Sequence, residues 1–419
     1  MRRPLLIIFI FILIYSFIYT KDRSFDKYHE NDILSIKGVI KDKKEKEKYN
    51  EYTIDKFLVR DYNKNNNILI GDILNTKGKY KSLDNMIFDD FNYGRYIKSI
   101  GLDGIIYMES YDIVGQNFLY KNIGRLKMYI SDTSRYLYKK NSDFINSILL
   151  GQRENLSKEQ NDIFQRSGTS HIIAISGLHT GILCAIISFL IGGINKFYKL
   201  LILFIIINIY MLMVGASPSI VRSIYFITIL YLSIFLDKKV DGISTLSIVG
   251  IFLVINNPYI IYNTSFQLSF LATLSIIYFY SYINRILKIS IISLTISANI
   301  LTLPIIYYNF KGISIISIIG NLIVVPFIGI IMYLSIISIF LFNLNIEISK
   351  FIAKINYIIV NIIYYSLEKI SDLYFVYIEI ENPKIYYVII YYIIIFSYMI
   401  YKEKTVIEEQ KNELQGYYK

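Results

Sequence analysis

Cysteine is nearly absent from this sequence. Cys184 is the single one among 419 residues, and it lies within an apolar run. No intramolecular disulfide can therefore form, and any domain outside the cytoplasm has to fold without one. Six prolines and no Ser/Pro-rich stretch argue against disordered linkers. Tryptophan is missing whereas tyrosine occurs 40 times, so tyrosine has to supply the aromatic residues at any membrane interface.

Charged residues are also few, and apolar residues dominate. Hydrophobic residues make up 54% of the chain and charged residues 18%. Long apolar runs in such a composition are typical of multi-pass membrane proteins. The formal net charge of +11 suggests a nucleic-acid partner, but the positions of the charges have to be considered first.

The first segment predicts a membrane helix. Residues 1–20 begin with Arg2 and Arg3 and then run apolar from Leu5 to Tyr19. A cleaved signal peptide needs a small-residue cleavage site after its apolar part, and none is evident. We therefore expect an uncleaved first helix.

Two segments of different character follow. Residues 21–115 alternate short apolar and polar stretches such as LSIKGVI and NILIGDIL, separated by polar turns, a pattern typical of a small all-β barrel or sandwich. Residues 116–168 change to helical spacing. They predict an amphipathic helix over 117–140, on the membrane or against another helix, and a short helix that Ser157 and Gln160 open as a capping box.

Residues 169–402 predict the membrane domain. A span needs roughly 17–25 apolar residues. Candidate spans lie near residues 170–191, 200–215, 218–236, 242–256, 264–283, 286–307, 313–342, 351–366 and 384–401. With the first helix they predict about ten transmembrane helices, followed by a cytoplasmic tail at 403–419.

Short-loop charges predict the orientation. Positive pairs follow every even-numbered span, at Lys196 and Lys199, Lys238 and Lys239, Arg285 and Lys288, Lys350 and Lys354, and Lys402 and Lys404. The positive-inside rule then places both termini in the cytoplasm and residues 21–168 outside. Much of the net charge is explained by this orientation and is not evidence of DNA binding.

The segment HIIAISGLHTGI (171–182) carries unusual polarity for the start of a span. Its surroundings place Ser170, Ala174, Gly177 and Gly181 at spacings of four, three and four, which predicts a small-residue stripe for helix packing. The alternative is that Ser176 and His179 face an aqueous cavity. A serine hydrolase is disfavoured, since no acidic partner is evident and SGLH is not a nucleophile elbow. A metal site at the two histidines of this segment is disfavoured too, because no further ligand cluster is visible.

Three further places interrupt the apolar pattern. VGASPSIVRS (214–223) combines a proline with Arg222, which either snorkels or lines a polar path. NTSFQLSFLATLS (263–275) brings several polar residues into one span, and residues 297–327 place prolines within two others. Such interruptions are tolerated in a bilayer where they are buried in protein or line water. Several of them in one bundle favour a water-lined path.

These motifs together resemble the ComEC family, the inner-membrane channels for DNA uptake in natural transformation. LLGQRENLSKEQNDIFQRSGTSHIIAISGLHTGIL (149–183) is similar to the opening of the family's competence domain. Three further blocks follow in the family's order, at 211–223, 257–275 and 302–327. FDDFNYGRYIKSIGLDGIIY (88–107) is similar to the end of the family's oligonucleotide-binding-like (OB-like) barrel.

The resemblance implies a polytopic α-helical membrane protein, with some helices discontinuous, an amphipathic helix and a small extracytoplasmic OB-like domain. It implies a channel for single-stranded DNA, without sequence preference. The positions proposed for the DNA path are His171, Ser176, Gly177, His179, Ser217, Pro218, Arg222, Gln267, Ser269, Pro304, Asn321 and Pro326. Ser170, Ala174 and Gly181 are assigned to helix packing.

The chain departs from the fullest family pattern at its carboxyl end. Many members carry a metallo-β-lactamase-like domain, whereas three histidines are too few for its dinuclear metal site. We therefore expect no enzyme activity, no cofactor and no metal. A separate DNA receptor, nuclease and cytoplasmic motor are expected as partners, besides the lipid bilayer and a possible homo-oligomer. The rival hypotheses are a transporter of another polar or anionic substrate and an intramembrane hydrolase using Ser176 and His179.

Overall fold

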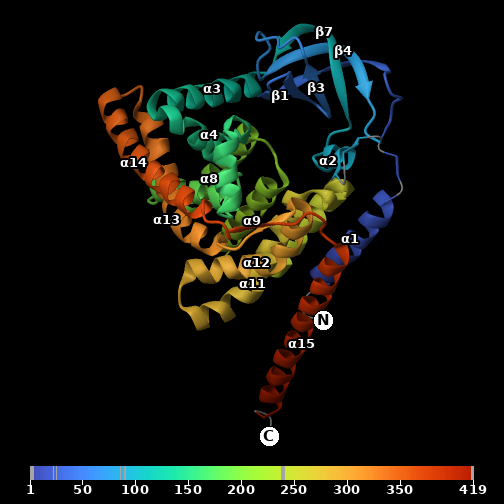
Figure 1. Cartoon of the computed structure of the whole chain (residues 1–419), viewed down its shortest axis with the longest axis vertical. Coiled ribbons are helices and arrows are strands. Elements are labelled where there is room, and N and C mark those ends of the chain that lie inside the picture. Colours follow the sequence, from blue (N-terminus) through green and yellow to red (C-terminus); the bar gives the residue numbers. More distant parts are fainter. Residues whose placement is uncertain are drawn as a thin grey trace.

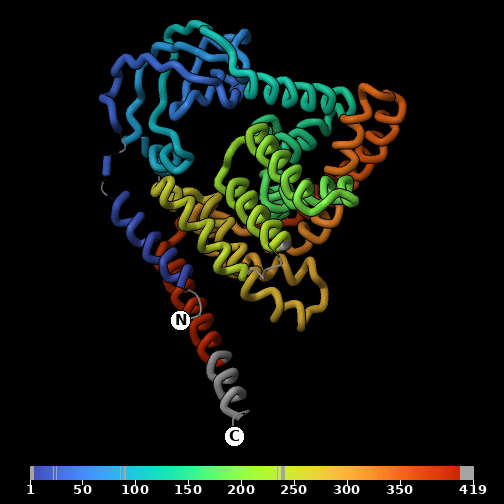
Figure 2. Tube along the Cα trace, turned by 180° about the vertical axis from the view of Figure 1, so that it is seen from behind, coloured from blue at the N-terminus to red at the C-terminus, as the bar shows by residue number. Residues whose placement is uncertain are grey.

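A β-barrel sits at one end of the molecule and a helical domain fills the rest (Figure 1). The computed structural model describes residues 4–21, 23–24, 26–84, 86–88, 91–236 and 241–416. Of the charged residues used in the sequence-based predictions, Arg2, Arg3, Lys238 and Lys239 lie outside these ranges. Seen from behind, the chain again has the barrel at one end, with residues 4–21 and 385–405 toward the other (Figure 2).

The predicted β domain is confirmed as a five-stranded closed barrel in the order β1-β2-β3-β7-β4. Its strands are β1 (Ile33–Glu45), β2 (Asn50–Ile54), β3 (Phe57–Asp61), β4 (Asp72–Lys81) and β7 (Gly104–Gln116). Strands β3 and β7 pair in parallel and all other neighbours are antiparallel. Inward residues such as Tyr52, Val59 and Leu74 are fully buried, which explains the alternation in the sequence. The arrangement fits an OB-like fold.

Two short elements lie between β4 and β7. The hairpin β5 (Ile87–Phe88) and β6 (Phe91–Asn92) leads into helix α2 (Tyr93–Ser99), which Asn92 caps through a bond from the Arg95 amide. Beneath α2 a second small core forms on the outside of the barrel, from Leu58, Leu83, Met86, Ile97, Leu102 and Ile105.

The helical segment 116–168 is only partly interfacial. Helix α3 (Phe118–Tyr138) matches the predicted amphipathic helix, and α5 (Lys158–Arg166) begins at the predicted Ser157 capping box. Between them, η1 (Lys139–Asn141), α4 (Ser142–Leu150) and η2 (Arg153–Asn155) connect the two helices. Phe144, Ile145 and Ile148 of α4 have no exposed surface and belong to the core of the helical domain. Burial of α4 was not predicted.

Apolar helices make up most of the remaining chain. They are α1 (Pro4–Lys21), α6 (Ser170–Ile173), α7 (Gly177–Leu190), α8 (Lys196–Val214), α9 (Pro218–Phe235), α10 (Gly242–Asn256), α11 (Thr264–Leu287), α12 (Ser290–Phe310), α13 (Ser317–Leu341), α14 (Ile346–Ser371) and α15 (Ile385–Gly416). Two short connections complete the domain, η3 (Pro258–Tyr262) and the pair β8 (Gly312–Ser314) with β9 (Tyr377–Glu379). Helix α15 continues into the predicted tail as far as Gly416.

Six of the described helices are long and apolar enough to cross a membrane: α1, α8, α11, α12, α13 and residues 385–405 of α15. Three shorter helices, α7, α9 and α10, are apolar as well. Helix α14, which covers the predicted span 351–366, is in neither group. The number of about ten crossings therefore stays a prediction.

The prediction of one continuous helix over 170–191 is wrong. The chain leaves the helical conformation at Ala174, and Ser176 has extended backbone before α7 begins at Gly177. Ser170 and Ala174 therefore do not share a helical face with Gly177 and Gly181. The predicted stripe is divided into two pieces, and a discontinuous helix results.

The expected breaks at the other prolines are not observed. Pro304 lies inside α12 and Pro326 inside α13, and both helices continue through them. A proline removes the amide that would bond the carbonyl four residues earlier, which for Pro304 is that of Ile300. The Tyr391 hydroxyl of α15 donates to this carbonyl oxygen at 2.9 Å, and the Tyr392 hydroxyl donates to that of Leu301 at 2.8 Å.

One predicted orientation marker disagrees with the structure. The positive-inside rule assigns Lys350 and Lys354 to the side of the membrane opposite to α3. The turn before α14 instead contacts α3, with the rings of Tyr136 and Phe342 5.4 Å apart, and α14 reaches the end of α3 (Figure 1). At its other end α14 meets α5, where Nε of Arg166 donates to the Ser371 carbonyl at 2.9 Å. Both ends of α14 thus lie beside elements predicted to lie outside.

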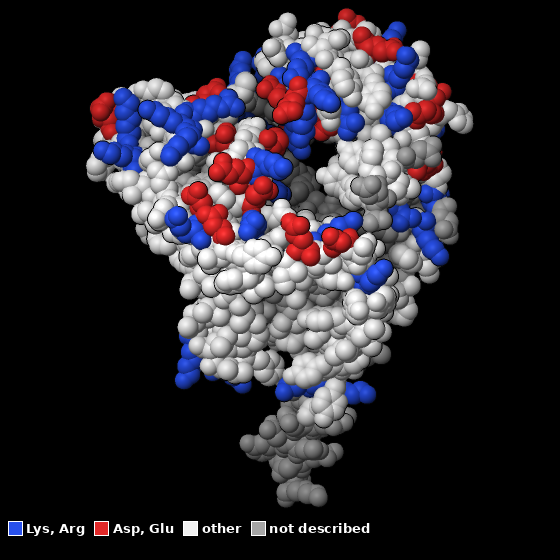
Figure 3. All heavy atoms as spheres, viewed as in Figure 1, with Lys and Arg blue, Asp and Glu red and all other residues white. Residues whose placement is uncertain are grey.

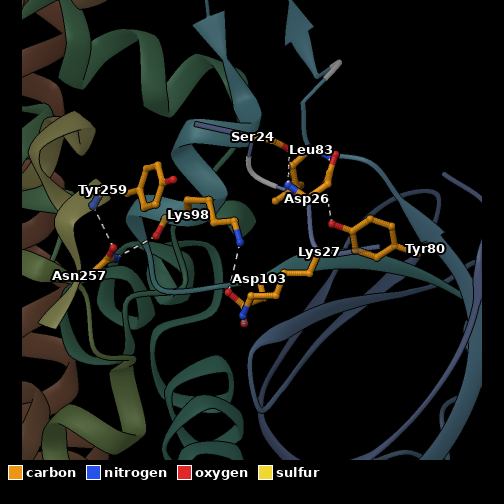
Figure 4. A network of polar contacts seen from close by, with 9 residues as sticks. All are labelled: Ser24, Asp26, Lys27, Tyr80, Leu83, Lys98, Asp103, Asn257 and Tyr259. Atoms are coloured by element: carbon orange, nitrogen blue, oxygen red, sulfur yellow. Dashed lines mark hydrogen bonds and ion pairs between the residues drawn. The ribbon is translucent and has the colours of Figure 1, made fainter. Parts of the chain in front are cut away.

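Polar contacts attach the barrel to the helical domain. The Asn257 side-chain amide donates to the carbonyls of Lys98 and Ser99 at 2.8 and 3.1 Å (Figure 4). Within the β domain, the Lys98 ammonium pairs with Asp103 at 3.2 Å. The adjacent Tyr259 packs against the small core beneath α2. The barrel is therefore fixed on η3 rather than tethered only by its linkers.

Candidate functional site

The predicted residue Arg222 lies at the centre of a polar cluster among apolar helices. From α9, its Nε donates to the Ser269 hydroxyl at 2.6 Å and its Nη1 to the Thr273 hydroxyl at 2.9 Å, both on α11. The third nitrogen is 3.5 Å from the hydroxyl of Ser223. Within the described ranges, no carboxylate lies within ion-pair distance of Arg222. The charge is held by neutral hydroxyls.

The amino end of α7 meets this cluster. A Cβ placed on Gly177 would lie 2.8 Å from the Ser223 hydroxyl and 3.3 Å from Nη2 of Arg222, so only glycine permits this approach without a shift. A helix amino end carries a fractional positive charge. The break before Gly177 thus brings a positive helix end beside an arginine without a described counter-charge. Together they form a cationic centre, which we call the Arg222 cluster: Gly177, Arg222, Ser223, Ser269 and Thr273.

Ser176 and His179 also meet, at the break itself. The Ser176 hydroxyl and Nδ1 of His179 are 3.2 Å apart, and the Ser176 amide donates to the same nitrogen at 3.3 Å. His179 is fully buried, and its Nε2 has no hydrogen-bond partner among the described residues. The side chain turns back to hold the first turn of α7, which is a structural use of the pair. The predicted exposure of His179 to a cavity is not observed.

Asn321 forms a separate polar contact. Its side-chain amide donates to the Thr295 hydroxyl at 3.4 Å, which joins α13 to α12, while its Oδ1 is buried without a described partner. Between the same two helices, Asn299 donates to Ser317 at 3.5 Å. These residues form a seam between two helices and do not reach the Arg222 cluster through any described hydrogen bond. Of the two prolines, Pro304 is buried in α12, whereas Pro326 is exposed on α13.

The other predicted positions have different surroundings. Gln267 donates to the Ile261 carbonyl at 2.8 Å and so secures η3. His171 and Ser217 are exposed, and Pro218 is the first residue of α9, where proline fits a helix without loss of a bond. A Cβ on Gly181 would meet no described atom within 4 Å, so no close helix approach depends on this glycine.

Sequence reasoning missed several residues of these contacts. Ser223 and Thr273 belong to segments with recognised polarity, and Thr273 follows Ser269 at a spacing of four, which places both on one face of α11. That spacing was a usable signal. Tyr391 and Tyr392 were not predicted, because nothing local links them to a proline in a distant part of the chain.

No group of three or more His, Cys, Asp or Glu side chains gathers as metal ligands in the described part of the chain. The polar groups around the break and at Arg222 are instead hydroxyls, amides, the His179 imidazole and one arginine. Such groups suit anions and water better than a divalent cation, which prefers carboxylate ligands.

Comparison with known proteins agrees with the motifs. The family described as Competence protein matches residues 148–405, which include the Arg222 cluster and the break before α7. ComE operon protein 3 of Bacillus subtilis (strain 168) is 31% identical over 217 residues. The match covers 51% of this chain and 28% of that protein. No solved structure matches the chain.

Proposed function

The chain belongs to the competence protein family, and from this premise we propose that it is a channel of the bacterial cytoplasmic membrane that takes up single-stranded DNA during natural transformation. The observation that carries the proposal is the Arg222 cluster. A cationic side chain at the bilayer centre costs roughly 2.5–3.5 kcal/mol on insertion scales. Arg222 lies in the second turn of the apolar helix α9, and its hydroxyl partners leave its positive charge uncompensated, so it can attract an anion.

The composition of the cluster suits a polyanion that has to pass. The guanidinium and the amino end of α7 attract a phosphate, while Ser269 and Thr273 hold the arginine in place between visits. The Arg222 cluster contains one arginine and no lysine, which gives a shallow site, whereas tight binding would stall transport. Phosphates occur in every nucleotide, so no sequence preference is expected.

The proposed orientation has both termini in the cytoplasm and residues 21–168 outside. Three loops predicted to be external are in contact with external elements. Asn257 binds α2, Ser314 donates to the Arg166 carbonyl at 2.8 Å, and Tyr377 accepts from Gln165 at 2.8 Å. Figure 3 shows acidic side chains over the upper half of the molecule, an uncharged belt below, and Lys and Arg at the lower edge of that belt. This distribution supports the orientation.

The main test replaces Arg222. In a competent host, Arg222→Gln is expected to lower uptake of labelled DNA about tenfold or more, while DNA bound at the cell surface and the amount of protein in the membrane stay unchanged. Arg222→Lys keeps the positive charge, but a lysine cannot donate to both Ser269 and Thr273 as the guanidinium does. Uptake should therefore lie between that of the wild type and that of Arg222→Gln. Normal uptake with Gln at this position would contradict the proposal.

A transporter of another anion would use the same cluster. This rival predicts that Arg222→Gln abolishes uptake of a different labelled anion and leaves transformation unaffected, whereas the DNA channel predicts that transformation fails.

The hydrolase hypothesis needs a reactive Ser176. Ser176→Ala and His179→Ala are therefore assayed for DNA uptake and for hydrolysis. The contacts at the break predict that His179→Ala reduces the amount of folded protein, whereas Ser176→Ala is milder. A purified chain whose hydrolytic activity disappears with Ser176→Ala would support the rival.

We further propose that a DNA receptor, a nuclease and a cytoplasmic motor act with this chain, and that the chain forms a homo-oligomer. Deletion of the gene should leave DNA bound at the cell surface and abolish internalised DNA. Loss of both would assign the chain to surface binding instead.

A further inference from the structure

A short segment connects the outer helix α5 to the Arg222 cluster. It comprises residues 167–176, which include α6, and we call it the α6 segment. Near its start, Gly168 has a φ of +73°, in the left-handed region, and near its end the backbone is extended at Ala174 and at Ser176. Hinges are a few loop residues of this kind, which absorb changes in backbone angles. The single turn of α6 is therefore flanked by a hinge position on each side.

The start of the α6 segment packs against α13, at the polar seam between α12 and α13. A Cβ on Gly168 would lie 2.5 Å from Cβ of Ser317, and a Cβ on Gly320 would lie 2.4 Å from the Ser167 carbonyl oxygen. The chains approach this closely because glycine carries no side chain. Ser317 is also the residue of the seam that accepts from Asn299 at 3.5 Å. The segment thus contacts the seam directly.

Apolar side chains lie between the two ends of the segment. Its far end leads directly into the Arg222 cluster at the amino end of α7. Ile172 and Ile173 are 0% and 1% exposed, and they belong to one buried core with Ile220 of α9 and Val324 of α13. Arg222 lies on α9 and the seam on α13, so the apolar turn of α6 separates the two polar groups. Charged phosphates avoid an apolar surrounding of this kind.

Three hydrogen bonds hold the end of α5 that leads into the segment. The Gln165 side-chain amide donates to the Tyr377 hydroxyl at 2.8 Å. The Arg166 carbonyl accepts from the Ser314 hydroxyl at 2.8 Å, and Nε of Arg166 donates to the Ser371 carbonyl at 2.9 Å. We call these bonds the clasp. The first two are exposed to solvent, so water can replace either partner at little net cost.

We propose that the α6 segment is the outer gate of the DNA path and that this structure shows the gate closed. When the clasp opens, the segment turns about its two hinges and withdraws the apolar turn from between α9 and α13. The Arg222 cluster and the seam of Asn299 and Asn321 then line one continuous path. While no DNA is present, the apolar turn blocks ions, as hydrophobic constrictions do in channels. This inference rests on the proposed function.

A reversible crosslink tests whether the gate has to open. With Cys184→Ser as background, Gln165→Cys/Tyr377→Cys places thiols on both sides of the clasp, where the side-chain ends are 2.8 Å apart. A cleavable bis-methanethiosulfonate reagent is added to competent cells, and uptake of labelled DNA is measured. Uptake is expected to fall about tenfold or more after crosslinking and to recover after reduction.

Lys79→Cys/Glu109→Cys is the matched control pair. These side chains lie 3.2 Å apart on neighbouring strands of the barrel and are 52% and 46% exposed, so the same reagent reaches them. Crosslinking there should leave uptake unchanged. Normal uptake by the clasp pair when its crosslinking is complete would overturn the gate.

The accessibility of a buried position measures the opening itself. In the same background, Ile173→Cys should react slowly with a membrane-impermeant maleimide, because Ile173 is 1% exposed. Adding Tyr377→Phe removes the hydroxyl of the clasp and should raise the reaction rate about threefold or more. Tyr374→Phe is the matched control, because Tyr374 is 98% exposed and outside the clasp. Equal rates with the two substitutions would remove the role of the clasp.

Failure of the gate and failure of the proposed function give different results. If the crosslinked clasp pair takes up DNA normally while Arg222→Gln does not, the channel stands and the gate falls. If Arg222→Gln takes up DNA normally, the proposed function itself fails, whatever the crosslink does.

Discussion

Gly177 decides how closely the broken helix approaches Arg222. A methyl group at this position meets the Ser223 hydroxyl at 2.8 Å, whereas at Gly181 it meets no described atom within 4 Å. We therefore expect Gly177→Ala to destabilise the chain by about 1–3 kcal/mol, as overpacking does, and to lower DNA uptake. Gly181→Ala is the matched control on the same helix. Thermal unfolding in detergent measures the difference, and equal melting temperatures would contradict the close approach.

At the residue scale, polar residues in apolar segments are the informative signal. Gly177, Arg222 and Ser269 come from separate segments that the sequence marks as unusual, and the structure brings them into one cluster. Gln267, two residues before Ser269, stands out on the same grounds but points to η3 instead. Composition indicates that a polar residue has a partner. It does not identify the partner, because that depends on how the helices pack.

At the scale of elements, Pro304 and the two tyrosines of α15 act as a unit. In a bilayer, a carbonyl freed by proline has no water to bond. We expect Tyr391→Phe/Tyr392→Phe to destabilise the chain by about 1 kcal/mol or slightly more, with Tyr398→Phe as an exposed control on the same helix. Replacing Pro304 with Ala restores the helical amide and should reduce the effect of Tyr391→Phe. An unchanged effect in the Pro304→Ala background would contradict the pairing.

The hairpin of α13 and α14 gives a second prediction at this scale. The turn at residues 342–345 contacts α3, whereas loop charges place it in the cytoplasm. With Cys184→Ser as background, Asn345→Cys should react with a membrane-impermeant maleimide added to intact cells. Ile289→Cys, in the loop between α11 and α12, is the protected reference, because the positive charges there predict a cytoplasmic position. Labelling of Asn345→Cys only after lysis would restore the ten-span topology.

Elements were predictable where local chemistry sets them. The alternation of β4 and the capping box at Ser157 are local patterns, and both are confirmed. The break before Gly177 was not predicted, since HIIAISGLHTGI has no proline and ordinary helical spacing. It forms because Ser176 and His179 bond each other and because the segment packs closely against Arg222 of another helix. Long-range packing of this kind cannot be read from a single sequence.

At the scale of the whole molecule, one carboxylate of the β domain supports the segment that docks on η3. Asp103 pairs with Lys27 at 3.0 Å and with Lys98 at 3.2 Å, and Lys98 also offers its carbonyl to Asn257. Burial tends to raise the pKa of Asp103, but the bonds from the two lysines outweigh it and hold the pKa below 3.8. The stabilisation is therefore present above that pH and is lost as pH falls through the lowered pKa.

Hydrogen exchange of α2 in the full chain checks this dependence. Protection should fall below about pH 3.8 in the wild type. In Asp103→Asn, protection should already be lower at neutral pH and should change less with acid. An identical pH profile in both proteins would contradict the role of Asp103.

The central claim is that the DNA strand passes the Arg222 cluster. The most direct measurement is photocrosslinking during uptake, with p-benzoylphenylalanine in place of Leu178, which is 40% exposed in the first turn of α7. Phe252 on α10, 48% exposed, is the matched control position. Labelled single-stranded DNA should crosslink at position 178 and not at position 252. Crosslinks at neither position, or at 252 alone, during active uptake would contradict the account.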